Sequence, residues 1–179
     1  KQWDTRKGNC VRSFHGHTGE VIALDLAENR RQIVSGGYDQ MIRLWDLQTG
    51  ICTRSIETDY KNIFIVRFTS DGDLILNGSD GGYNSGDLKV FGMDPFREKH
   101  VLEGHDGEVY SIDITPDGRK MLSGGHDSNA ILWDLVQGQQ ITPLIDNDDY
   151  STRSYVWTVA ISPDGRLALV GDEFGKLEV

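Results

Sequence analysis

Short runs of apolar and polar residues recur along the chain, and they predict β-strands. The first strands are expected at residues 10–14, 21–26, 32–35 and 41–45, which are rich in β-branched and aromatic residues and bounded by Gly, Asn or Asp. Further strands are expected at residues 63–68, 74–77, 88–91, 108–114, 120–125, 130–134, 156–162, 166–171 and 176–179. The pattern predicts an all-β chain of short antiparallel strands.

Four polar or aromatic residues return with the same spacing in two parts of the chain. The stretch Gly16–Asp46 is closely copied by Gly104–Asp134, and in both the His-to-Ser, His-to-Asp and His-to-Trp intervals are 18, 22 and 28 residues. The corresponding residues are His17, Ser35, Asp39 and Trp45 in one copy and His105, Ser123, Asp127 and Trp133 in the other. A fixed period of this kind indicates a repeat architecture.

The strand pattern divides the chain into four repeat units, approximately 4–46, 47–92, 93–134 and 135–179. The second unit has Asp59, Asn77 and Phe91 where the first and third units have His, Ser and Trp, and it carries extra residues within the segment 79–87. Trp3 stands where a unit ends, and the fourth unit stops one residue before its Trp is due. We therefore expect further repeats outside these residues.

The motifs G-H, S-G-x-x-D and W-D, at about 40 to 46 residues per unit, resemble the WD-repeat β-propeller family. The resemblance implies four-stranded antiparallel blades fanned into a ring, with about four repeat units present in a larger ring of about seven blades. It also implies that each unit begins with the outer strand of one blade and continues into the next. The remaining blades would be supplied by the rest of the chain or by self-association. Alternatively, residues 10–14 would complete the blade of residues 155–179, and the chain would form a four-bladed ring by itself or an eight-bladed ring as a dimer.

In that family the repeated polar set forms one hydrogen-bonded chain, which the resemblance assigns to both copies here. The Trp indole donates to the Ser hydroxyl, the hydroxyl bonds the His imidazole, and the Asp carboxylate orients the imidazole. A Ser, His and Asp set also invites a hydrolytic interpretation. Because the same set occurs twice and is expected in the middle of a sheet, we favour a structural network, with no catalytic residues and no enzyme activity.

Charge and composition narrow the classes of ligand. The formal net charge is -10 and the sequence pI is near 4.8, so the surface should repel nucleic acid. The chain has no apolar run long enough to span a membrane and no secretory signal at its start, so no membrane association is expected.

No metal or cofactor is expected. His15 and His17 lack a third ligand nearby, and the glycine-rich segment 79–87 fits neither a phosphate-binding loop nor a calcium loop. Cys10 and Cys52 occupy one repeat position twice and are expected as reduced, half-buried strand residues of a cytoplasmic or nuclear protein.

Two irregular loops, 79–86 and 145–154, depart from the repeat and should open on one face of the propeller. Residues expected on that face as a partner-binding site are Tyr38, Tyr60, Tyr83, Asn84, His126, Asp146, Asp148, Asp149, Tyr150, Arg153 and Tyr155. Tyrosines beside acidic residues favour a protein or peptide partner with a basic segment. The expected function is a non-catalytic interaction scaffold. Two alternatives stay open: a sensory or regulatory propeller attached to a kinase or NTPase domain outside this chain, and loops that are merely solvated.

Overall fold

The computed structural model describes residues 1–27, 31–59, 62–70, 72–79, 88–145, 154–175 and 177–178, with residues 74–79 and 177–178 described as backbone only. Within these residues the chain is built from antiparallel β-sheets. No helix in this part of the chain is long and apolar enough to cross a lipid bilayer. The all-β fold expected from the strand pattern is confirmed.

Four sheets, here called blades 1 to 4, follow one another along the chain. Blade 1 consists of β3 (Val21–Ala27), β4 (Gln32–Gly37), β5 (Met41–Asp46) and β6 (Cys52–Glu57). Blade 2 consists of β7 (Asn62–Phe68), β8 (Leu74–Ser79), β9 (Leu88–Met93) and β10 (Phe96–Leu102). Blade 3 consists of β11 (Val109–Ile114), β12 (Lys120–Gly125), β13 (Ala130–Asp134) and β14 (Gln139–Ile145). Blade 4 has three described strands, β15 (Val156–Ile161), β16 (Ala168–Asp172) and β17 (Leu177–Glu178).

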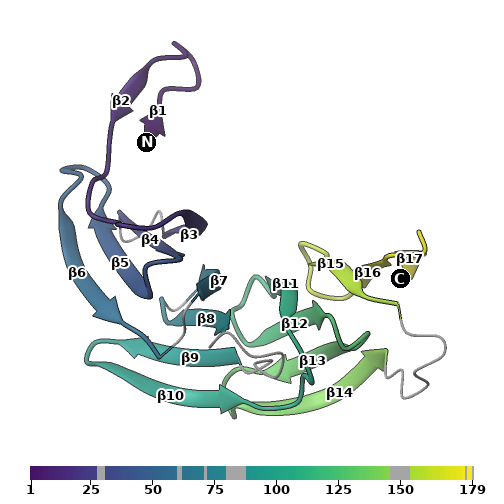
Figure 1. Ribbon diagram of the computed structural model, residues 1–179. Coiled ribbons are helices and arrows are strands. Elements are labelled where there is room, and N and C mark those ends of the chain that lie inside the picture. Colours follow the sequence, from purple (N-terminus) through teal and green to yellow (C-terminus); the bar gives the residue numbers. More distant parts are fainter. Residues whose placement is uncertain are drawn as a thin grey trace.

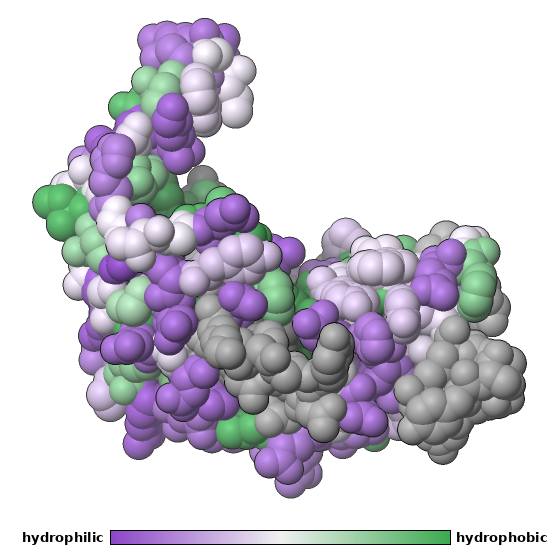
Figure 2. Space-filling model, in the orientation of Figure 1, coloured by the Kyte–Doolittle hydropathy of each residue, from purple (hydrophilic) through white to green (hydrophobic). Residues whose placement is uncertain are grey.

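The blades stand side by side in an open arc (Figure 1). The first strand of each blade, namely β3, β7, β11 and β15, lies on the concave side, and β6, β10 and β14 form the convex rim. The outer side of the arc is largely hydrophilic, and the concave side is hollowed (Figure 2). This arrangement is that of propeller blades in a ring that is not closed here.

A separate hairpin precedes blade 1. Strands β1 (Gln2–Trp3) and β2 (Cys10–Arg12) pair only with each other, and they project from the end of the arc opposite to blade 4 (Figure 1). The expected alternative in which residues 10–14 complete the blade of residues 155–179 is therefore not formed. Both cysteines are free, and Cys10 is exposed rather than half-buried because this hairpin packs on no complete blade.

The hydrophobic core lies between neighbouring blades. Val34 and Ile42 of blade 1 pack against Ile63 and Val66 of blade 2, and equivalent clusters fill the next two junctions. The glycine after the network serine permits this contact, because a Cβ on Gly36 would lie 2.6 Å from Ile63 Cγ2. The S-G-G sequence in β4 and β12 therefore serves the packing between blades.

Each first strand carries a one-residue β-bulge at the same position. In blade 1, Val21 pairs with Gly37 and Ala23 with Gly36, so Ile22 has no ladder partner. The residues skipped in the other three blades are Phe64, Tyr110 and Trp157. A bulge twists the strand locally and redirects the skipped side chain. These four large residues therefore mark one recurrent position at the start of the innermost strands.

Candidate functional site

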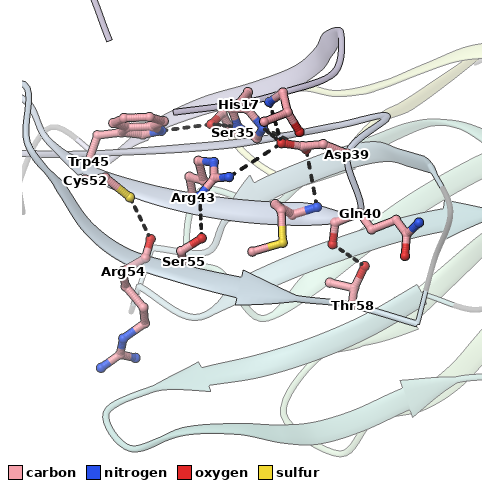
Figure 3. Close-up of polar contacts among 12 residues, drawn as sticks. His17, Ser35, Asp39, Gln40, Arg43, Trp45, Cys52, Arg54, Ser55 and Thr58 are labelled. Carbon is pink, nitrogen blue, oxygen red and sulfur yellow. Dashed lines mark hydrogen bonds and ion pairs between the residues drawn. The ribbon is translucent and has the colours of Figure 1, made fainter. Parts of the chain in front are cut away.

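The repeated polar residues of the first copy form a continuous hydrogen-bonded chain (Figure 3). The Trp45 indole N–H donates to Ser35 Oγ at 2.8 Å. Ser35 Oγ lies 2.7 Å from His17 Nε2, and His17 Nδ1 lies 2.8 Å from Asp39 Oδ1. The chain therefore links β5, β4, the turn before β3 and the tight turn after β4.

The second copy repeats the arrangement in blade 3. Trp133 Nε1 donates to Ser123 Oγ at 2.7 Å, and Ser123 Oγ lies 2.7 Å from His105 Nε2. His105 Nδ1 lies 2.9 Å from Asp127 Oδ2. All four side chains are buried, and Ser123 has an exposed fraction of 0%. Burial of this polar chain is tolerated because its members bond one another.

The two aspartates also anchor the backbone around them. Asp39 accepts the Thr18 amide at 3.0 Å and Asp127 accepts the Asp106 amide at 3.0 Å. Burial raises the pKa of Asp127, but the hydrogen bond and charge of His105 and the amides of Asp106 and Asn129 outweigh burial, so its pKa lies below the usual value. Asp39 behaves in the same way, and its pKa is also lowered.

Each aspartate has a further partner that differs between the copies. Arg43 Nη2 lies 3.6 Å from Asp39 Oδ2, whereas the Asn129 side-chain amide donates to Asp127 Oδ2 at 3.2 Å. Arg43 occupies the position of Ile131, which is buried between blades 2 and 3. The serine, histidine and tryptophan contacts are common to both copies, and the outer partner of the carboxylate adapts to the local packing.

The bonding order of this set is the same as that of a hydrolytic triad, so accessibility decides its chemistry. A carboxylate only accepts hydrogen bonds, so Nδ1 of each imidazole donates to the Asp, while Nε2 is bonded to the Ser hydroxyl. Ser123, however, also accepts the Trp133 indole and is closed off from solvent. A substrate therefore has no approach to its oxygen in this structure.

Ser35 differs because one side of blade 1 is uncovered. It borders a cavity of about 460 Å³ together with His17 and Trp45, and its exposed fraction is 6%. The apolar wall of this cavity includes Val21, which is 45% exposed, whereas the equivalent Val109 is 1% exposed beneath blade 2. The cavity is therefore the side of a blade that a neighbouring blade covers elsewhere in the arc.

An aromatic cluster lies where blades 3 and 4 meet, and it consists of Tyr110, His126, Tyr155 and Trp157. The rings of His126 and Tyr155 stack with centroids 4.3 Å apart, and those of Tyr110 and Trp157 stack at 4.7 Å. Edge-to-face contacts at 6.4 Å between Tyr110 and His126 and at 6.1 Å between Tyr155 and Trp157 join the two pairs. Trp157 remains 52% exposed.

Two glutamates accompany this aromatic cluster. The His126 amide donates to the Glu108 carbonyl at 2.8 Å, and the Glu173 amide donates to the Tyr155 carbonyl at 3.1 Å, so the backbone of each glutamate is bonded to that of a cluster residue. Burial raises the pKa of Tyr110, and the nearby Glu108 carboxylate, Tyr155 and Glu173 raise it further. The cluster therefore presents aromatic rings and has two glutamates nearby.

The structure places three of the residues expected in the partner-binding site. His126 and Tyr155 are brought together, whereas Tyr38 lies in blade 1, two blades away, with its side chain 46% exposed. The remaining expected residues are outside the described part of the chain: Tyr60, Tyr83, Asn84, Asp146, Asp148, Asp149, Tyr150 and Arg153. Their part in binding stays a prediction, as does that of loops 79–86 and 145–154.

Sequence reasoning missed Tyr110 and Trp157. The sequence pattern predicts both only as members of a strand, because alternation alone does not reveal the bulge that redirects them. One signal was available in the sequence, since the same repeat position holds Ile22, Phe64, Tyr110 and Trp157, all of them large and none charged. In the described part of the chain, no group of three or more His, Cys, Asp or Glu could hold a metal ion.

The fold and the two buried networks define an all-β protein assembled from propeller blades. Residues 8–46 and 96–134 match the family described as "WD domain, G-beta repeat". The matched segments contain all eight residues of the two polar networks. The second segment begins with β10, the outer strand of blade 2, and the first begins with β2 of the separate hairpin. The resemblance to the WD-repeat family is confirmed, and the chain carries WD40 repeats at these two positions.

Similar proteins from several organisms support the same assignment. The chain is 27% identical to Autophagy-related protein 16 of Arabidopsis thaliana and 32% identical to guanine nucleotide-binding protein subunit beta-5b of Danio rerio. It is 25% identical to WD repeat-containing protein SL1-17 of Schistosoma mansoni. These alignments cover 99%, 91% and 99% of this chain, but 34%, 40% and 56% of the respective relatives. The chain therefore spans between about a third and somewhat over half of each relative.

Proposed function

We propose that this chain is a non-catalytic scaffold that binds a protein or peptide partner on one face of the propeller arc. The face is the one that carries Tyr38, His126 and Tyr155, and at which the strands flanking loops 79–86 and 145–154 end. The single observation that carries the proposal is the aromatic cluster at the junction of blades 3 and 4, in which Trp157 is exposed. Exposed aromatic residues are frequent anchors of protein interfaces.

A repeated backbone contact supports the grouping of these residues on one face. The amide of the tight-turn residue donates to the carbonyl just before the first strand, as in Tyr38 to Glu20 at 2.9 Å and His126 to Glu108 at 2.8 Å. The Glu173 amide makes the same bond to Tyr155 in blade 4. In three blades, therefore, the turn between the second and third strands lies beside the segment that leads into the first strand.

The buried networks support a role without catalysis. The polar groups of each network hydrogen-bond one another and so join strands. They are therefore not available for the hydrolytic chemistry that a Ser, His and Asp set could perform. The name of the Danio rerio relative describes a subunit of a larger assembly. Function through association agrees with that name and with general WD-repeat architecture.

Charge supports a partner with a basic segment. The chain has 28 acidic against 18 basic residues, and complementary charge raises association rates and helps to select partners. In sequence, Asp146, Asp148 and Asp149 stand a few residues before Tyr155 of the aromatic cluster. The partner is therefore expected to be less strongly bound at high ionic strength.

The test is affinity capture of partners followed by mass spectrometry. The parent chain is compared with two variants. In one, loops 79–86 and 145–154 are shortened, and the other carries both Asp148→Lys and Asp149→Lys. Asp94→Lys is the control, because Asp94 is exposed in a turn between third and fourth strands, on the opposite face. We expect the loop and charge variants to lose partners that the control retains. Retention of every partner by the loop and charge variants would overturn the proposal.

A further inference from the structure

The aromatic cluster has a preorganised shape. Tyr110 and Trp157 are bulge residues of neighbouring innermost strands, so the ladder leaves both side chains free to stack on each other across the blade junction. His126 from a tight turn and Tyr155 from the start of blade 4 form the second stacked pair. Because each ring supports another, a ligand that binds here has little side-chain motion to restrain.

Only part of the cluster is available to a ligand. Stacking at 4.7 Å with an interplanar angle of 10° covers one face of the Trp157 ring with Tyr110. Trp157 nevertheless keeps 52% of its surface exposed, whereas the other three rings are partly buried. The indole is therefore the surface that a partner side chain would meet first.

The electrostatic surroundings favour a cation on this indole. The face of an aromatic ring carries partial negative charge, and Trp attracts cations more strongly than Tyr or Phe. Glu108 and Glu173 adjoin the cluster, and both act on the Tyr110 hydroxyl. A planar guanidinium stacks on an aromatic face and also bonds carboxylates, whereas an ammonium group has no plane to stack.

We propose that the aromatic cluster binds an arginine side chain of the protein partner, with the guanidinium stacked on Trp157 and its charge facing Glu108 and Glu173. This inference rests on the proposed function, and it names the chemistry that the partner presents at that site. A neutral apolar or proline-rich segment is the competing occupant, since it would also cover an exposed indole.

The probe is a capped pentapeptide, Gly-Ala-Arg-Ala-Gly, titrated into the chain while NMR follows the indole N–H resonances. The matched peptides replace arginine by citrulline, which keeps the planar shape without the charge, or by leucine. We expect saturable shifts of the Trp157 resonance with the arginine peptide and about tenfold weaker binding of the citrulline peptide. Equal binding of the arginine and citrulline peptides would show apolar stacking and overturn the inference.

Variants separate a binding role from a packing role. Trp157→Leu should weaken arginine-peptide binding about tenfold, and Trp157→Phe should retain part of it. For Trp157→Leu, whose own indole is lost, fluorescence anisotropy of a labelled peptide replaces NMR. Glu108→Gln with Glu173→Gln should weaken binding and reduce its salt dependence. Trp3→Leu, which removes an exposed indole (55%) in the hairpin before blade 1, is the control and should bind like the parent.

Thermal unfolding of each variant identifies any that fails to fold. If Trp157→Leu does not fold, the peptide affinity of Trp157→Phe is compared with that of the parent instead. Unchanged peptide binding by Trp157→Leu would overturn the inference. If a folded Trp157→Leu variant no longer binds the arginine peptide but still captures every partner, the inference is overturned and the proposed function stands. Arginine binding at Trp157 with no loss of partners on loop shortening would support the inference and contradict the proposed partner face.

Discussion

The Asp113 carboxylate of blade 3 accepts a hydrogen bond from the Ile161 amide of blade 4, with 2.6 Å between Oδ2 and nitrogen. Asp25 accepts the Phe68 amide at 2.8 Å at the first blade junction. Innermost strands are sheet edges, whose outward amides lack a strand partner. Each aspartate therefore satisfies an edge amide of the next blade and ties two blades together.

Removal of this contact should weaken the junction between blades 3 and 4. We expect Asp113→Ala to lower the free energy of unfolding by about 1.5–3 kcal/mol, because it deletes a hydrogen bond to a charged acceptor. Arg67→Ala is the control: Arg67 holds the same repeat position in blade 2 and makes only a half-exposed ion pair of 3.6 Å with Asp25. Urea unfolding measures both variants, and an equal cost for the two would contradict this role.

Gly36 should be intolerant of a side chain because the next blade occupies the space. A Cβ there would lie 2.6 Å from Ile63 Cγ2, and overpacking of this kind costs about 1–3 kcal/mol. Gly92→Ala is the matched control, since its Cβ would meet only the flexible end of Lys99. Thermal unfolding should show a clear loss of stability for Gly36→Ala and a small change for Gly92→Ala. The reverse order would mean that the blades do not pack as described.

Acid should weaken the His105 and Asp127 pair. The pKa of Asp127 in the folded chain lies below its usual 3.8, so its stabilising contribution is complete above that value and is lost as the pH falls through the lower, folded pKa. We expect Asp127→Asn to be less stable than the parent at neutral pH and the difference to shrink below pH 3.8. Urea unfolding across this range measures it, and a difference that grew on acidification would have the wrong sign.

Ser123 should not react as a nucleophile. A fluorophosphonate probe labels serines that an adjacent base activates and that solvent can reach. Ser123 is buried, so we expect no labelling of the folded chain at this residue, as judged by mass spectrometry of peptides. Labelling at Ser123 that His105→Gln abolished would instead indicate a working catalytic pair.

The fold was predictable from sequence because strand pattern and polar spacing agree. Residues 41–45 and 130–134 were expected as strands and occur as β5 and β13, with the network tryptophans in place. The pairing of His126 with Tyr155 was not predictable in its geometry, because these residues are 29 positions apart and meet only through the junction of two blades. The bulge at Tyr110 and Trp157 is not predictable from residue type, because it depends on the register of pairing.

The uncovered side of blade 1 also lay beyond sequence reasoning. Valine occupies the same repeat position in both copies, as Val21 and Val109. Val109 is buried and Val21 is exposed because a neighbouring blade covers only Val109. Local sequence determines which residues face a junction, whereas burial depends on what stands across that junction. Repeat proteins behave in this way because each unit contacts only its neighbours.

The free energy of unfolding of Ser123→Ala tests whether the repeated Ser, His, Asp and Trp residues join strands inside the blades. The substitution leaves the Trp133 indole and His105 Nε2 without their common partner, and each unsatisfied buried group costs about 1–3 kcal/mol. We expect a loss of that size in urea unfolding. A folded Ser123→Ala variant as stable as the parent would mean that this set of residues does not hold the strands together.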